Sequence, residues 1–308
     1  MNYYNHNQNP LEEIKSFFRK KNILSRLILI NVIVFIAANI INLVIWLFIG
    51  QQANAVFSDV VSWFAVPSDI SALLSKPWTI FTYMFLQENF FHIFFNMFVL
   101  YFGGRIFLEY LSQKKLLSTY IWGGLIGGLF YVIAFNVFPV FNQYKTLSVA
   151  LGSSASVLAI LVAIATYVPN YSMTLILLGR VKLKYIALAL VVIDILSIQK
   201  GNPGGHIAHL GGALWGYLYI AVLKNGFDMN KFFNNFNFSN IFKTFMKPKK
   251  SASKHYSKNR SVSDEDYNYH KKYDQKQIDS ILDKISKSGY ESLSKAEKEI
   301  LFKTSNRK

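Results

Sequence analysis

Long apolar segments alternate with short polar ones through the first two thirds of the chain. A helix needs about 20 mostly apolar residues to cross a bilayer, and six segments approach or reach that length. Because a lipid-exposed backbone must satisfy its hydrogen bonds within its own segment, each is predicted to be helical. The pattern therefore predicts an all-α membrane protein with six transmembrane helices. They cover residues 24–49, 92–111, 117–138, 149–168, 183–198 and 207–223.

Lysine and arginine are unevenly distributed among the polar connections. They are frequent before the first span, after the second and fourth spans and in the tail, whereas the other connections hold only Lys76, Lys145 and Lys200. Loops rich in these residues stay in the cytoplasm, so both termini are predicted to be cytoplasmic. The long connection 50–91 carries many aromatic side chains and is predicted to lie in the membrane interface.

Composition agrees with a membrane domain that is followed by a polar tail. Of the 308 residues, 16% are charged, below the roughly 25% usual in soluble domains. We assign the net charge of +16 to topology and contact with the lipid bilayer, and not to nucleic acid, because no nucleic-acid-reading motif accompanies it. Since the chain has no cysteine, thiol catalysis and disulfides are excluded. The first apolar segment lacks a small-residue cleavage site and is interpreted as a retained span.

The sequence predicts four parts with different composition. In the last part, apolar residues at helical spacing flank Gly289, and Ser294 followed by Glu297 fits a capping box, so a helical hairpin is expected. This hairpin is a candidate surface for a cytosolic partner. The parts are a cytosolic segment (1–23), the six-span domain (24–223), a basic linker (224–276) and the C-terminal hairpin (277–308).

Polar side chains inside the predicted spans are costly in lipid, so each is a candidate for function. The second, fourth and sixth spans run in the same direction and place a hydroxyl, an amide and imidazoles near their outer ends, at similar depth. A serine with an adjacent histidine can act as a nucleophile, and N–H groups beside it can stabilise an oxyanion. The groups at this depth are Ser154, His209, His92 and Asn96, with the Ser154 backbone N–H as a further donor.

Four segments resemble the motifs of rhomboid intramembrane proteases, in order and on matching spans. The tail resembles a short C-terminal module found on some bacterial rhomboids, which implies a multi-pass protein of the bacterial cytoplasmic membrane. The four segments are the connection motif 77–86 with Trp78, His92-x-x-x-Asn96 continuing to Gly103-Gly104 and Glu109, Gly152-Ser153-Ser154-Ala155, and Ala208-His209-x-x-Gly212-x-x-x-Gly216.

The resemblance implies an intramembrane serine endopeptidase that uses a Ser–His dyad and no metal or cofactor. It maps the nucleophile onto Ser154, the base onto His209, and the oxyanion donors onto His92 and Asn96. The implied substrates are single-pass transmembrane proteins whose helices unwind easily at their outer ends. Access to the scissile bond would then depend on local helix weakness, because a stable transmembrane helix shields its backbone.

Three glycines have expected roles in the backbone. Gly152 permits the tight bend before the nucleophile. Gly212 and Gly216 are four residues apart, and this spacing of small residues should let the sixth span pack closely against the fourth.

The sequence departs from the family pattern at four positions. Thr79 replaces a common arginine, and Gln87 stands where many members have histidine. Ala155 replaces the glycine after the nucleophile, and Leu158 replaces an aromatic residue that stacks on the base. None of these removes a catalytic group, but other packing must hold His209.

Two other functions are compatible with parts of the sequence. The first is a proteolytically inactive rhomboid-like protein that binds membrane clients, although such relatives usually lose one of Ser154, His209 and Asn96. The second is a transporter with a proton relay through histidines. It would predict inverted-repeat symmetry between the two halves, which the sequence does not show.

Two further polar groups have competing interpretations. His206 and His209 share a helix face and could suggest a metal site, but no His-Glu-x-x-His motif is present and no acidic ligand is expected at that depth. Asp194 could be a triad acid, yet the family resemblance implies a dyad. It is therefore interpreted as a polar contact between helices.

Overall fold

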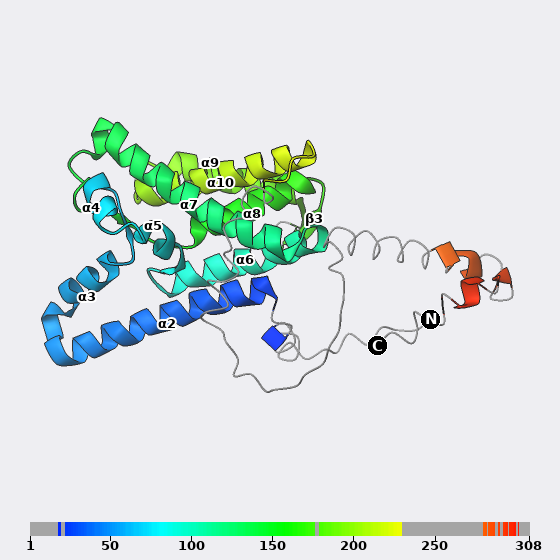
Figure 1. Ribbon diagram of the computed structural model, residues 1–308, viewed down its shortest axis with the longest axis horizontal. Coiled ribbons are helices and arrows are strands. Elements are labelled where there is room, and N and C mark those ends of the chain that lie inside the picture. Colours follow the sequence, from blue (N-terminus) through cyan, green and yellow to red (C-terminus); the bar gives the residue numbers. More distant parts are fainter. Residues whose placement is uncertain are drawn as a thin grey trace, which may run out of the picture. The chain divides into compact units, whose positions relative to one another are not determined.

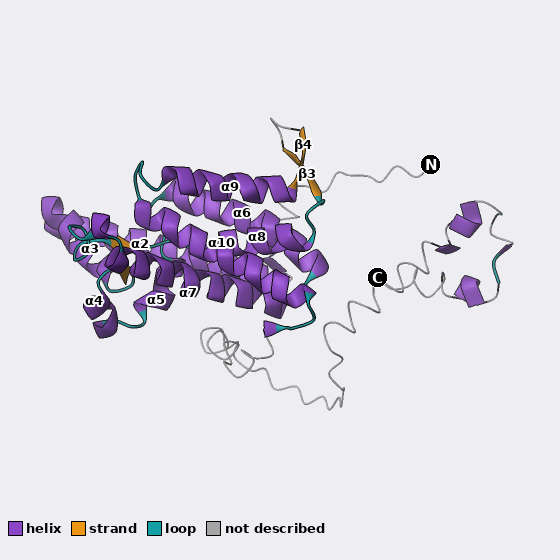
Figure 2. Cartoon of the chain, turned by 90° about the horizontal axis from the view of Figure 1, so that it is seen from above, coloured by secondary structure: helices purple, strands orange, loops and turns teal. Residues whose placement is uncertain are grey.

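The computed structural model divides the chain into two units, Met1–Ile241 and Phe242–Lys308, which are considered separately. Figures 1 and 2 show that the described part of the first unit is predominantly helical. The residues that the structure describes are 18–19, 22–175, 179–229, 280–281, 283–286, 289, 292–294, 296–299 and 301.

Among the described residues of the first unit, six long helices pack into a bundle, as Figure 1 shows. Helix α10 packs against α7, α8 and α9, while α6 packs against α8 and α2. Several helices begin where an Asn or Ser side chain accepts a backbone N–H of the first turn, as at Asn22, Asn89 and Ser112. The helices are α2 (Ile23–Ile49), α6 (Phe90–Tyr110), α7 (Gln113–Val137), α8 (Ser154–Tyr167), α9 (Leu183–Ser197) and α10 (Pro203–Lys224).

Within the part of the chain that the structure describes, four helical segments are long and apolar enough to cross a membrane, namely Ile23–Ser62, Phe90–Tyr110, Gln113–Val137 and Pro203–Lys224. Large apolar side chains on these helices are exposed, for example Phe48 at 86%, as expected of surfaces that face lipid. The chain is therefore a multi-pass membrane protein. Helices α8 and α9 have only 14 and 15 residues, fewer than the about 20 that a full span needs. Helix length therefore supports four of the six predicted membrane spans and does not test the other two.

The predicted fourth span begins later than expected. Residues Val149–Ala150 (β2) pair antiparallel with Val66–Pro67 (β1), and α8 starts only at Ser154. Between them Gly152 adopts φ +134°, a conformation that glycine tolerates and that ends regular structure. The expectation of a purely α-helical protein was thus incomplete, because a second short sheet pairs β3 (Ser172–Leu175) with β4 (Gly179–Lys182).

The connection between α2 and α6 is folded. Trp78 donates its indole N–H to the Trp63 carbonyl oxygen at 2.8 Å, and the two rings stack with centroids 6.3 Å apart. Thr79, one of the departures from the family pattern noted in the sequence, is buried and donates to the Lys76 carbonyl oxygen at 2.7 Å. The connection contains η1 (Gly50–Gln52), α3 (Ala53–Ser62), β1, α4 (Ile70–Ser75), α5 (Thr79–Thr82) and η2 (Tyr83–Phe85).

Helices α8 and α10 touch through their backbones. A Cβ atom on Gly212 would collide with the carbonyl oxygen of Ala155, and one on Gly216 would collide with that of Ala159. These two glycines therefore allow a close approach that any other residue would prevent, as the sequence spacing predicted. Ala155 is accommodated because Gly127 of α7 faces its methyl group.

A buried polar network is centred on Gln87. Its side-chain nitrogen donates to Asn31 Oδ1 at 3.0 Å and to Ser153 Oγ at 2.8 Å, and its oxygen accepts from Asn96 Nδ2 at 2.9 Å. Asn31 also donates to the Tyr120 hydroxyl at 3.0 Å. The network joins α2, α6 and α7 to the residue before α8, and it satisfies polar groups that would be costly if left unpaired in an apolar bundle.

In the second unit, the expected capping box is present. The Ser294 backbone N–H donates to Glu297 Oε2 at 2.7 Å, and the Glu297 N–H donates to Ser294 Oγ at 3.3 Å. The hydrogen bond from Ser294, together with Lys284, lowers the pKa of Glu297 to about 2. Most of the predicted linker 224–276 lies outside the described residues, so the predicted domain boundaries stay predictions.

Replacing Gly212 with alanine should destabilise the bundle, because the added methyl group meets the Ala155 carbonyl oxygen. We expect the free energy of unfolding to fall by about 1–3 kcal/mol, the usual cost of overpacking. Thermal unfolding in detergent measures the change. Ala221→Val, at a half-buried position of the same helix, should have an effect within about 0.5 kcal/mol. Equal losses in both variants would contradict the proposed contact.

Gln87→Met should also destabilise the protein, because it leaves buried polar groups of Asn31, Asn96 and Ser153 without their partner. An unsatisfied buried group costs about 1–3 kcal/mol, and we expect a loss of at least that size in denaturant unfolding. The matched control is Gln52→Met, the same change at an exposed position. An unchanged stability of Gln87→Met would show that the network does not hold the bundle together.

Candidate active site

Ser154 is the first residue of α8 and projects its hydroxyl toward α10. The positive φ of Gly152 turns the chain out of the extended segment, and the Gly152 N–H donates to the Tyr83 carbonyl oxygen at 3.0 Å. Ser153 is the N-cap residue of α8, and its hydroxyl oxygen accepts a hydrogen bond from the Gln87 side chain. The two adjacent serines therefore belong to different surroundings, and only Ser154 faces a histidine.

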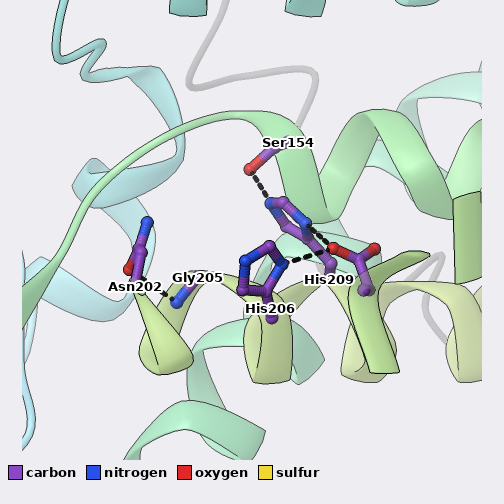
Figure 3. A network of polar contacts seen from close by, with 6 residues as sticks. Ser154, Asn202, Gly205, His206 and His209 are labelled. Carbon is purple, nitrogen blue, oxygen red and sulfur yellow. Dashed lines mark hydrogen bonds and ion pairs between the residues drawn. The ribbon is translucent and has the colours of Figure 1, made fainter. Parts of the chain in front are cut away.

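His209 lies in the second turn of α10 with its ring beside Ser154 (Figure 3). The distance from His209 Nε2 to Ser154 Oγ is 2.6 Å, a hydrogen-bond length. The helix begins at Asn202, which has a φ of 46° and accepts the Gly205 N–H at 3.0 Å. The structure thus brings the predicted nucleophile and base together, on helices that Gly212 holds in close contact.

Asp194 of α9 is hydrogen-bonded to the ring nitrogen of His209 that does not face Ser154. Its Oδ1 lies 2.8 Å from His209 Nδ1 and also 2.8 Å from His206 Nδ1. Asp194 was expected to make a polar contact between helices, and its hydrogen bonds do join α9 to α10, but the sequence did not identify its partners. In the sequence it stands four residues before the end of the predicted span 183–198, which was expected to run outward, and this could have signalled that it shares the depth of His206 and His209.

Asp194, His206 and His209 also offer ligand types that suit a metal ion, and their ligand atoms lie within 4.8 Å of one another. No acidic ligand was expected at this depth from the sequence, and the position of Asp194 corrects that expectation. Metal bonds of about 2.0–2.1 Å would separate neighbouring tetrahedral ligand atoms by about 3.3 Å. The observed 2.8 Å separations are those of hydrogen bonds from imidazole to carboxylate.

His92 lies against the bend that precedes Ser154. A Cβ atom on Gly152 would come within 2.8 Å of His92 Cε1 and 3.5 Å of Ser154 Oγ. His92 Nδ1 accepts the Glu88 backbone N–H at 3.3 Å, so a neutral ring carries its hydrogen on Nε2. That places an N–H donor beside the nucleophile. The Ser154 backbone N–H is a second donor, because first-turn N–H groups have no acceptor within their helix.

Asn96 reaches the site indirectly. Its Nδ2 donates to Gln87, which in turn donates to Ser153. An amide nitrogen carries two hydrogens, and this bond uses one of them. The geometry therefore gathers Ser154, His209 and His92 directly and connects Asn96 through the buried network.

Glu109 belongs to a different part of the molecule. It follows His92 by 17 positions on α6, about 25 Å along a helix. Near it Arg105 donates to the Tyr101 hydroxyl at 2.9 Å. Burial, and then the charge of Glu109, raise the pKa of Tyr171. Glu109 thus lies with polar groups at the C-terminal end of α6, far from Ser154.

These groups have the composition of an acyl-transfer site. A hydroxyl is hydrogen-bonded to an imidazole, the imidazole is hydrogen-bonded to a carboxylate, and N–H donors lie beside the hydroxyl. Such an arrangement is recognised by its geometry and by the role of each group.

Comparison with known proteins agrees with this geometry. Residues 74–226 match the model of the rhomboid domain, and residues 262–307 match a family of unknown function, DUF6576. Presenilin-associated rhomboid-like protein A, mitochondrial, of Danio rerio is 30% identical over 132 residues. That match covers 42% of this chain and 33% of the relative, so the chain spans about a third of that relative's length.

The matched segment contains α6 to α10 and with them Ser154, His209, His92 and Asn96. The chain is therefore a rhomboid-domain protein, with its rhomboid domain at residues 74–226.

Proposed function

We propose that this protein is an intramembrane serine endopeptidase in which Ser154 is the nucleophile and His209 is the base. The observation that carries the proposal is the 2.6 Å hydrogen bond between Ser154 Oγ and His209 Nε2. It joins two helices within the rhomboid domain, at the position where the sequence motifs imply a catalytic pair. The proposed reaction hydrolyses a peptide bond and needs no cofactor.

In the acylation step, Ser154 Oγ attacks the carbonyl carbon of the scissile bond and His209 Nε2 takes the hydroxyl proton. The tetrahedral intermediate collapses, the C–N bond breaks, and His209 gives the proton to the leaving amine. A water molecule then attacks the acyl group while His209 takes its proton. The ester bond breaks, the new carboxyl group leaves, and His209 returns the proton to Ser154.

The oxyanion of each intermediate is proposed to lie between His92 Nε2–H and the Ser154 backbone N–H. Both donors are placed before the reaction, one by the Glu88 N–H and the other by the start of α8. The positive end of the α8 dipole also favours a developing negative charge there. Asn96 is proposed to support this region through Gln87, and its second amide hydrogen is a further donor.

All six long helices are proposed to cross the membrane, with α8 and α9 as short spans. Both termini and the C-terminal hairpin would then be cytoplasmic, in a bacterial cytoplasmic membrane, with the connection 50–91 in the interface. Ser154 would lie below the outer surface, reached by water from that side. The proposed substrates are single-pass transmembrane proteins with a weak helix near the outer end, where the backbone can be exposed.

Ser154→Ala and His209→Ala should each abolish cleavage of a single-span reporter protein in detergent, because each removes one partner of the proton transfer. A fluorophosphonate should label the wild type on Ser154 and should not label Ser154→Ala. Gel fluorescence and mass spectrometry of the labelled peptide measure both outcomes.

The matched control is Ser153→Ala, which removes the neighbouring hydroxyl that bonds to Gln87 and should retain the label. Label that survives in Ser154→Ala but is lost in Ser153→Ala would reverse the nucleophile assignment. A folded wild type that neither cleaves nor takes the label would favour the inactive, client-binding rival.

His92→Phe should lower kcat by about 10²–10³, the usual effect of removing one oxyanion donor. The apolar ring keeps the packing against Gly152 but lacks the N–H, so KM should change little. Steady-state cleavage of the same reporter gives both constants. Phe94→Leu, an exposed change two positions further along the same helix, should leave both constants near wild type. A wild-type kcat for His92→Phe would show that His92 is not an oxyanion donor.

A further inference from the structure

The carboxylate of Asp194 is buried between α9 and α10 and faces two histidines. The residue is 6% exposed, and one oxygen, Oδ1, accepts the hydrogen bonds from both histidines. A buried carboxylate is costly unless donors surround it. His206 and His209 supply those donors from successive turns of α10, with ring planes 86° apart.

The hydrogen-bond pattern selects the tautomer of His209. An ionised carboxylate only accepts hydrogen bonds, so the Nδ1 atom that lies 2.8 Å from Asp194 must carry a hydrogen. A neutral imidazole then has no hydrogen on Nε2, which is the atom 2.6 Å from Ser154 Oγ. This is the tautomer that can accept the serine proton.

His206 has a complementary effect on the carboxylate. Its Nδ1 must also carry a hydrogen to bond to Asp194 Oδ1. The two imidazoles therefore occupy both lone pairs of one oxygen and fix the rotation of the carboxylate toward His209. This arrangement restrains the His209 ring although Leu158 stands where an aromatic residue would pack on it.

We propose that Asp194 is a positioning residue that holds His209 with its hydrogen on Nδ1, and that His206 holds Asp194 in place. The expected dyad is then a Ser154–His209–Asp194 triad with a second histidine on the acid. The effect on catalysis rests on the proposed function, whereas the tautomer of His209 does not. Once His209 has taken the serine proton, the adjacent carboxylate also stabilises the imidazolium.

The first test reads the tautomers directly by ¹⁵N NMR of the histidines in the full-length protein, at about pH 8, where a free imidazole is neutral, and with a chelator present. His206→Gln and His209→Gln assign the two rings. In the wild type we expect both rings to carry hydrogen on Nδ1 only. Asp194→Asn should move part of the hydrogen to Nε2 in both rings, and Ile195→Val, an exposed change on the same helix, should move neither.

Hydrogen on Nε2 of His209 in the wild type would overturn the proposal, and that measurement needs no variant of Asp194 to fold. Unchanged tautomers in a folded Asp194→Asn protein would also overturn it. If Asp194→Asn changes the tautomer of His209 and leaves that of His206 unchanged, then His206 does not hold Asp194 in place.

The second test is the rate at which a fluorophosphonate labels Ser154. Replacing the acid of a Ser-His-Asp triad with asparagine lowers turnover by about 10⁴, so Asp194→Asn should slow labelling by about 10²–10⁴. Ile195→Val should label at the wild-type rate. Labelling of Asp194→Asn at the wild-type rate would contradict a positioning role in the reaction.

The two tests separate this inference from the proposed function. If the wild type shows the expected tautomers but is never labelled, the protease assignment fails and the positioning of His209 stands. If the wild type is labelled and its tautomers differ from those expected, the protease stands and the role of Asp194 fails.

Discussion

The close contact between α8 and α10 determines whether this site exists. Gly212 and Gly216 let the α10 backbone reach the carbonyl oxygens of Ala155 and Ala159, so the two helix axes are as near as their backbones permit. Ser154 lies in the first turn of α8 and His209 in the second turn of α10, and a hydrogen bond of 2.6 Å between their side chains depends on that spacing. A helix displaced by the width of a methyl group could not be compensated by a different side-chain rotamer, because a serine side chain is too short.

The two adjacent serines, Ser153 and Ser154, have different hydrogen-bond partners. Ser153 bonds to Gln87, which joins it to Asn31 and Asn96, whereas Ser154 bonds to His209. Inside an apolar bundle each polar group needs a partner, and exchanging partners would leave others unpaired. The Gln87 set therefore fixes the start of α8 and prevents the adjacent hydroxyl from competing for the histidine.

The sequence indicated the long helices and the depth of the polar residues because both depend on local pattern, namely apolar length and position along a span. Apart from the Ser154–His209 pair and the packing at Gly212 and Gly216, which motifs and spacing implied, it did not indicate contacts between segments far apart in the chain. The pairing of Val66–Pro67 with Val149–Ala150 shortens α8 and has no local signal. Asp194 was judged by its place in one helix, and only the packing of α9 on α10 shows that it meets His209. Likewise, Gln87 was recognised as a departure from the family, but its bond to Asn96 required the folded bundle.

The short length of α9 has a consequence for the surrounding bilayer. Its 15 residues rise about 22 Å, whereas the hydrocarbon layer is about 30 Å thick. Unlike α8, whose side chains are mostly buried, α9 exposes Leu188, Ile193 and Leu196 on the surface of the bundle. If α9 spans the membrane as proposed, lipids beside it would compress or tilt to match it, which makes the membrane locally thin at modest energetic cost. A neighbouring helix of ordinary length would have its outer end pushed out of the hydrocarbon in this thinned zone, where water can compete for its backbone hydrogen bonds. The deformation of the lipid by α9 would thus loosen the helices that approach it, before any contact with Ser154.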